Sequence, residues 1–204
     1  MKSGQEKPKI IVISRECGSG GSHIAHLLAQ RLGVPFYDKN FVDKAVEETG
    51  LSTACMEQEE QKFISSLLFS LATGGYHHND NKAMADQVFI AETNALKEVA
   101  RQGACVIVGR CADYVLQDEF DVFSVFIHAD IAWRAQRGIR EYGLEPRRAE
   151  QSIRDKDRRR ARHYEYYTDR TWGDRNNYHL SINAARFTQE QAVELIVQAL
   201  QAVE

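Results

Sequence analysis

The sequence has little that points to a membrane or to an oxidising compartment. No apolar run approaches the roughly 20 residues that a helix needs to cross a bilayer. The opening letters, MKSGQEKPK, contain no apolar stretch of the signal-peptide type. The four cysteines show neither C-x-x-C spacing nor a histidine pattern typical of zinc sites. We therefore expect a cytoplasmic protein with reduced thiols, no membrane partner and a flexible lead-in over residues 1–8.

Excess positive charge is also missing. The formal net charge is -3, so the overall electrostatics give no support for a nucleic-acid partner. A length of 204 residues suits one domain and is enough to bury a substantial core. The composition allows a homodimer but does not require one.

Apolar runs without polar alternation mark the expected strands, at Ile10–Ile13, Ala104–Val108 and Val122–Ile127. Continuous runs of this kind are typical of strands that are covered on both faces, which indicates a parallel sheet. Shorter strands are expected at Val34–Asp38 and Tyr178–Asn183. Helical patterns separate the strands, so the chain is predicted to have an α/β fold.

Two helical regions stand out. Residues 39–102 contain no strand pattern and are predicted to form a helical insert between the second and third strands. The final helix is expected from Thr188 to Val203, and Thr188 with Gln191 forms a plausible capping box.

The segment IIVISRECGSGGSHIAHLLAQRL, residues 10–32, predicts a buried strand, a glycine-rich turn and an amphipathic helix. Glycines allow successive backbone N–H groups to converge on an anion, and the helix N-terminus adds free donors. We favour a phosphate-binding loop over a tight turn without a ligand. The lysine that ends such loops is absent, because Gly21 stands in its place and Ser22 follows.

Three segments carry a family resemblance: ISRECGSGGSHIAHLLAQRLGVPFYDKNFV, VIVGRCADYVL and the arginine-rich IRDKDRRRARHYEYYTDRTWGDRNNYHLSIN. In this order they resemble the cytidylate kinase-like family of P-loop proteins. The resemblance implies a nucleoside monophosphate kinase fold, with a five-stranded parallel sheet in the order 2-3-1-4-5, a helical acceptor-binding insert and a lid, here residues 142–175. It also implies ATP and Mg²⁺.

The chain departs from established cytidylate kinases at two places. Gly21 replaces the phosphate-binding lysine, while Arg15 stands where the first loop glycine belongs. Cys111 follows Gly109-Arg110 where those kinases carry an aspartate. The first departure raises the question of what supplies the missing charge, and we expect Arg15 or a lid arginine to do so.

The candidate site residues fall into three groups. Binding of the ATP phosphates is predicted for Ser14, Gly18, Ser19, Gly20, Gly21, Ser22 and His23, with the Ser22 hydroxyl also on Mg²⁺. Acceptor binding is predicted for Asp38, Lys39, Arg110 and Asp113. Charge stabilisation during transfer is predicted for Arg15, Arg110, Arg154, Arg158 and Arg162.

Some of these residues have ordinary alternative roles. Arg110 directly follows a strand, at the sheet edge where α/β proteins bind ligands, but a surface ion pair is the alternative. Asp38 could instead cap the next helix. Arg154, Arg158 and Arg162 share one helix face, which also fits a solvated, salt-bridged helix or, less well, a nucleic-acid patch.

The leading functional hypothesis is a kinase that transfers the γ-phosphoryl group of ATP to a small acceptor, most simply a nucleoside monophosphate such as CMP. Two alternatives stay open. One is a nucleotide-binding or sensing module with little turnover, which the missing lysine suggests. The other is a kinase of a non-nucleotide small molecule, because the fold does not fix the substrate.

Overall fold

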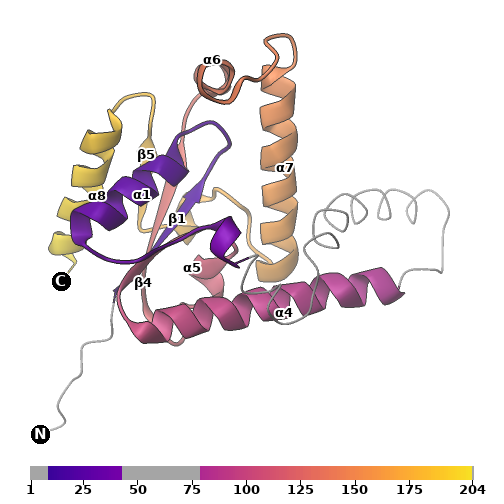
Figure 1. Cartoon of the computed structure of the whole chain (residues 1–204), viewed down its shortest axis with the longest axis vertical. Helices are drawn as coiled ribbons and strands as arrows, with labels where there is room; N and C mark the ends of the chain where they lie inside the picture. The colour runs from indigo at the N-terminus through magenta and orange to yellow at the C-terminus, as the bar shows by residue number, and fades with distance from the viewer. Residues whose placement is uncertain (1–8, 43–78, 204) are drawn as a thin grey trace, which may run out of the picture. The chain divides into compact units, whose positions relative to one another are not determined.

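The structure is a computed structural model that describes residues 9–42 and 79–203. The chain divides into two compact units, one of residues 1–38 with 100–204 and the other of residues 39–99. The first unit contains the sheet and the glycine loop (Figure 1). The predicted lead-in and residues 43–78 of the predicted insert lie outside the described residues. From the later part of the insert the structure describes the helix α4, Asn79–Gln102.

Five parallel strands form one sheet in the order β2-β3-β1-β4-β5, which confirms the predicted fold class and strand order. The strands are β1 Lys9–Arg15, β2 Phe36–Tyr37, β3 Cys105–Val108, β4 Asp121–His128 and β5 Leu180–Asn183. Three are shorter than predicted: β3 by one residue, and β2 and β5 by more. Val34 instead closes the preceding helix, its N–H donating to the Ala29 carbonyl at 3.1 Å, and Tyr178 ends a short 3₁₀ turn.

Helices follow the strands as the sequence pattern predicts. In the first unit they are α1 Gly21–Leu32, α5 Ala112–Val115, α6 Ile131–Tyr142, α7 Ala149–Thr168, the 3₁₀ helix η1 Arg175–Asn177 and α8 Gln189–Ala202. Within residues 9–42 and 79–203, no helix combines the length and the apolar character that crossing a membrane requires.

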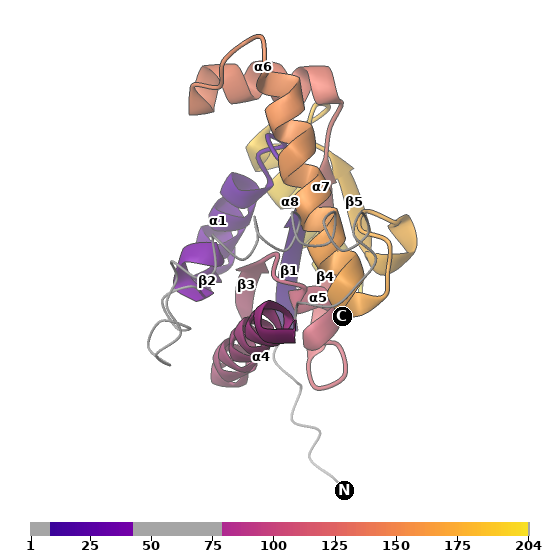
Figure 2. The same ribbon diagram turned by 90° about the vertical axis from the view of Figure 1, so that its right-hand side faces the viewer.

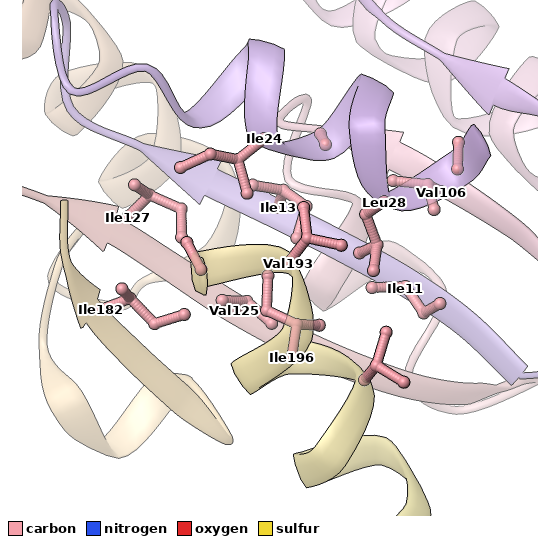
Figure 3. Close-up of a cluster of buried hydrophobic side chains, with 14 of the residues drawn as sticks. Ile11, Ile13, Ile24, Leu28, Val106, Val125, Ile127, Ile182, Val193 and Ile196 are labelled. Carbon is pink, nitrogen blue, oxygen red and sulfur yellow. The ribbon is translucent and has the colours of Figure 1, made fainter. Parts of the chain in front are cut away.

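One face of the sheet is covered by α1 and α8, whose apolar stripes meet side chains of β1, β3, β4 and β5 (Figure 3). Ile13, Leu28 and Ile196 are fully buried in this layer. Burial of each such side chain contributes about 1.5–3 kcal/mol relative to exposure. This packing fixes α1 against β1, and therefore fixes the loop that joins them.

The two helices of this layer, α1 and α8, differ in how their N-termini are capped. α8 starts with the predicted capping box, in which the Thr188 hydroxyl accepts from the Gln191 N–H and the Gln191 side chain accepts from the Thr188 N–H. α1 starts after Gly20, which has no side chain to cap the first turn. The Gly21 N–H donates to the Ser19 Oγ and the His23 N–H to the Gly20 carbonyl, so the Ser22 N–H is the donor of this first turn that is left to another partner, such as a ligand.

Candidate active site at the glycine loop

The loop between β1 and α1 crosses the carboxyl edge of the sheet, where open α/β sheets bind ligands. In both views it points toward the end of the sheet where α6 and α7 lie (Figures 1 and 2). Within the part of the chain that the structure describes, the N–H groups of Gly18, Gly20 and Ser22 have no hydrogen-bond acceptor. These donors and the uncapped end of α1 form a cradle for an anion.

Arg15 occupies the space next to the position of the missing lysine. A Cβ atom on Gly21 would lie 2.5 Å from the Arg15 Cβ and 3.1 Å from the Arg15 Cγ, so only glycine fits beside this arginine. The Arg15 Nε donates to the Ser22 Oγ at 3.3 Å. Its Nη1 lies against Gly109, where an added Cβ would be 2.4 Å away. The Arg15 side chain therefore runs from the glycine loop to the end of β3.

Three guanidinium groups gather at this place. The pKa of Arg15 is lowered to about 9, first by burial and then by the nearby charges of Arg160 and Arg110, against smaller opposing effects of Cys17 and Asp38. Like charges brought together at reduced solvation are unfavourable unless an anion joins them. Asp157 lies 3.6 Å from Arg160, and the remaining positive charge of the cluster suits a phosphate-like group beside the free amides of the loop.

We expect removal of the Arg15 charge to stabilise the ligand-free protein. Because the folded-state pKa of Arg15 is lowered to about 9, the folded chain holds this proton less tightly than the unfolded chain does. The resulting cost is complete below about pH 9 and falls as the pH rises from there toward the ordinary arginine value. Arg15→Met should raise the free energy of unfolding by about 1 kcal/mol at neutral pH.

Urea unfolding of both proteins without ligand measures this difference. The gap between wild type and Arg15→Met should narrow at about pH 10 relative to pH 7. A gap of the opposite sign at neutral pH, with the variant less stable, would show that Arg15 serves the fold instead of a ligand.

Arg137 of α6 approaches the loop from the other side. Its side chain is only 6% exposed, and its Nη2 pairs with the Glu141 carboxylate at 2.6 Å. The Nη1 has no hydrogen-bond partner within the described residues. A Cβ atom on Gly20 would be 2.0 Å from this nitrogen. An unpaired donor buried against the loop is costly, and a phosphate oxygen in the loop would satisfy it.

The turn after β3 is strained. Gly109, Arg110 and Cys111 have φ angles of 73°, 58° and 53°, and positive φ is unusual for the latter two residue types. Such strain gathers at functional sites when the surroundings hold it in place. Here the turn lies beside the Arg15 guanidinium and carries Arg110, the predicted acceptor-binding residue. Asp113, further along, is buried and accepts from the Tyr164 hydroxyl at 2.6 Å.

The other predicted binding residues take varied positions. Ser14 is buried in β1, where its side chain interacts with Tyr178. His23 is exposed in the first turn of α1, near Glu190. Asp38 follows β2 with its carboxylate close enough to act on the Arg15 pKa. Lys39 is the first residue of the second compact unit.

The structure does not bring Arg154, Arg158 and Arg162 to the loop. They lie on the exposed face of α7, where Arg154 pairs with Glu150 at 3.6 Å and Arg158 with Asp155 at 3.3 Å. The opposite face of α7 meets the loop. From that face the Arg160 Nη1 donates to the Arg15 carbonyl at 2.9 Å.

Several residues at the site were missed by reasoning from the sequence, namely Glu16, Arg134, Arg137, Asp157 and Arg160. A signal for two of them was present. Arg134 and Arg137 are three residues apart in the helix that directly follows β4, the strand beside β1, so both start from the same sheet edge as the loop.

The parallel sheet in this strand order, with the glycine loop at its carboxyl edge, defines the P-loop kinase fold. A family model described as the cytidylate kinase-like family matches residues 10–186, and the chain belongs to this family. No curated protein matches the chain.

Solved structures share the fold. An uncharacterized protein from Eubacterium ventriosum is 23% identical with a TM-score of 0.72, over 94% of this chain and 98% of that one. Shikimate kinase from Acinetobacter baumannii, in complex with shikimate, is 17% identical with a TM-score of 0.53, over 100% and 98%. A gluconokinase from Sinorhizobium meliloti is 14% identical with a TM-score of 0.54, over 98% and 95%. At these identities the likeness concerns the fold alone.

Proposed function

We propose that the protein is an ATP-dependent phosphotransferase that moves the γ-phosphoryl group to a small acceptor, most simply a nucleoside monophosphate such as CMP. The observation that carries this proposal is the convergence of Arg15, Arg110 and Arg160 beside a loop with free amides, where burial and the two neighbouring charges lower the Arg15 pKa to about 9. Membership of a kinase family agrees with it.

On the donor side, the Gly18, Gly20 and Ser22 amides would bind phosphate oxygens, with the Arg137 Nη1 as a further donor. Arg15 would take the part of the absent lysine. Its guanidinium is already held between Ser22 and Gly109, so little reorganisation is needed when charge develops on the moving group. Arginine remains a cation at neutral pH even with its pKa at about 9.

On the acceptor side, Arg110 would hold the acceptor phosphate, since it lies in the strained turn after β3 and its charge acts on Arg15. An oxygen of that phosphate would attack the γ-phosphorus as the bond to the bridging oxygen of ADP breaks. A phosphate oxygen is already ionised at neutral pH, so this step needs no general base. The site accordingly has to supply position and positive charge, which is what its arginines offer.

The residues present fit a magnesium ion. The Ser22 Oγ is exposed and accepts one hydrogen bond from Arg15, which leaves a lone pair for a metal. Within the described residues, no cluster of three or more His, Cys, Asp or Glu side chains forms a metal site. This suits Mg²⁺, which proteins commonly hold through few side chains, with phosphate and water as the other ligands. Bound there, the ion would neutralise phosphate charge.

An acceptor panel tests the proposal. ADP formation from Mg-ATP is measured with nucleoside monophosphates and, in parallel, with hydroxylated acids and sugars. We expect one nucleoside monophosphate to raise ADP formation well above the rate without acceptor. If ATP binds but no acceptor raises the rate, the binding or sensing module becomes the better reading. If neither ATP nor phosphate binds, the kinase and the binding or sensing module are both contradicted.

A non-nucleotide acceptor is the second candidate, and Cys111 is the reason. This residue stands where cytidylate kinases are expected to carry an aspartate, and it is buried at 3% exposure. A buried thiol thus stands there in place of a carboxylate. Stimulation by a hydroxylated acid or sugar, and by no monophosphate, would favour this candidate.

A further inference from the structure

The glycine loop has two parts with different hydrogen bonding. In the first part, residues 15–17, the polar backbone groups are taken by protein partners. The Glu16 N–H donates to the Ile127 carbonyl at 3.0 Å, and the Arg15 carbonyl accepts from Arg160. In the second part, the Gly18, Gly20 and Ser22 N–H groups have no acceptor within the described residues. The first part is anchored, and the second part is left for a ligand.

An ionic network of α6 and α7 makes most of this anchor. The Asp157 Oδ1 accepts from the Cys17 N–H at 2.6 Å, while its Oδ2 accepts from the Arg134 Nη1 at 2.5 Å. The same Arg134 nitrogen donates to the Cys17 carbonyl at 3.0 Å. Cys17 is therefore held at both its N–H and its carbonyl by one arginine–aspartate pair from two helices.

Glu16 extends the network to the end of β4. Its carboxylate lies 3.3 Å from the Arg134 Nε and accepts from the Ala129 N–H at 3.0 Å. The Arg134 Nε also donates to the Ala129 carbonyl at 2.8 Å. Arg134 is only 6% exposed, so its charge is buried among these partners. Buried charges with complete hydrogen bonding hold a single geometry strongly.

We propose that Arg134 and Asp157 are positioning residues, which hold residues 15–17 so that the amides that follow face the phosphate. The inference rests on the proposed function of the loop. Neither residue needs to touch the ligand, because the Arg134 Nε and Nη1 and both Asp157 oxygens are engaged with protein groups. The partner of the loop in this inference is the phosphate chain of a nucleoside triphosphate.

The sign of a charge effect separates positioning from simple electrostatics. Asp157 is a negative group beside a phosphate site, so electrostatics alone predict that Asp157→Asn tightens phosphate binding. A positioning role predicts weaker binding. The two carboxylate oxygens of Asp157 accept from the Cys17 N–H and from Arg134, whereas a neutral asparagine amide has one oxygen acceptor and no charge. Misplacement of a loop by about 1 Å can cost on the order of 100-fold, and we expect a loss of about tenfold or more.

Asp155→Asn is the matched control. Asp155 lies on the same helix, and its carboxylate accepts from Gln151 and Arg158 at the exposed surface. The control removes the same charge without touching the loop. Affinities for Mg-ATP and for tripolyphosphate are measured by calorimetry on the intact wild-type protein and on both variants, with heat unfolding as the check of the fold.

We expect Asp157→Asn to bind both probes at least about tenfold more weakly than wild type, and Asp155→Asn to bind within about twofold of it. Equal or tighter binding by Asp157→Asn overturns the positioning role alone. Failure of the wild type to bind either probe overturns the proposed function as well.

A second measurement uses the wild-type protein only, in case Asp157→Asn does not fold. Amide hydrogen exchange followed by NMR should show a slowly exchanging Cys17 N–H and a fast Gly20 N–H without ligand. Tripolyphosphate should slow the exchange of Gly20 and leave Cys17 almost unchanged. A fast Cys17 amide in the ligand-free protein would show that the anchor does not exist.

Discussion

A lysine at position 21 should be tolerated only when Arg15 is removed with it. Gly21→Lys alone is expected to lower the free energy of unfolding by about 1–3 kcal/mol, as overpacking of a well-filled site does. It should also abolish measurable ATP binding. The double variant Arg15→Gly/Gly21→Lys should recover most of the lost stability and bind ATP.

The reason is that the two positions share one space. A Cβ atom on residue 21 would lie 2.5 Å from the Arg15 Cβ, a distance that real atoms do not accept, whereas the next contact, with the Ile127 Cβ, is 3.1 Å. Removal of the Arg15 side chain removes the clash with Arg15. The contact with the Ile127 Cβ stays tight, but a small shift can relieve it. The double variant then matches the pattern G-x-x-x-x-G-K-[ST] over residues 15–22 at every fixed position.

The full cycle of four proteins measures how strongly the two positions are coupled. Arg15→Gly alone has neither the Arg15 guanidinium nor a lysine at position 21. We therefore expect its turnover to fall by a factor on the order of 10² to 10³, as when a preorganised charge is lost. Turnover in the double variant should exceed that in both single variants. If Arg15→Gly keeps wild-type ATP affinity and turnover, Arg15 does not stand in for the lysine.

The fold could be predicted because its signals are local. Apolar runs gave three of the five strands a clear pattern, and the glycine turn tied the first strand to the helix after it. A parallel sheet with helical crossovers leaves few arrangements, and the family resemblance selected one of them. The ends of the strands were harder to predict than their positions. Val34, for example, could extend a strand or close a helix, and in the structure it closes the helix.

The sequence was most informative about the candidate site where the chain itself is continuous. The loop residues 18–22 are neighbours in sequence, so their spacing was informative. Arg137, Asp157 and Arg160 reach the loop from α6 and α7, and which face of α7 turns inward depends on packing. Periodicity showed that Arg154, Arg158 and Arg162 share a face, but not that Ile153 and Tyr164 bury the other one.

Gly20→Ala should nearly abolish phosphate binding while the protein stays folded. Gly20 has a φ angle of 86°, and an added Cβ would be 2.0 Å from the Arg137 Nη1. The methyl group would push this guanidinium off the loop and also strain the backbone at the first turn of α1. We expect the affinity for Mg-ATP to fall on the order of 100-fold, because the amides and the Arg137 donor both lose their positions.

Gly33→Ala separates the two causes, because Gly33 at the other end of α1 has a φ angle of 67° but nothing within 4 Å of an added Cβ. Both variants should lose about 1–2 kcal/mol of stability from the left-handed backbone, as measured by urea unfolding. Only Gly20→Ala should lose ATP affinity by calorimetry. Equal ATP affinities in the two variants would mean that the space between Gly20 and Arg137 does not hold phosphate, and the charge that replaces the lysine would then have to come from Arg15 alone.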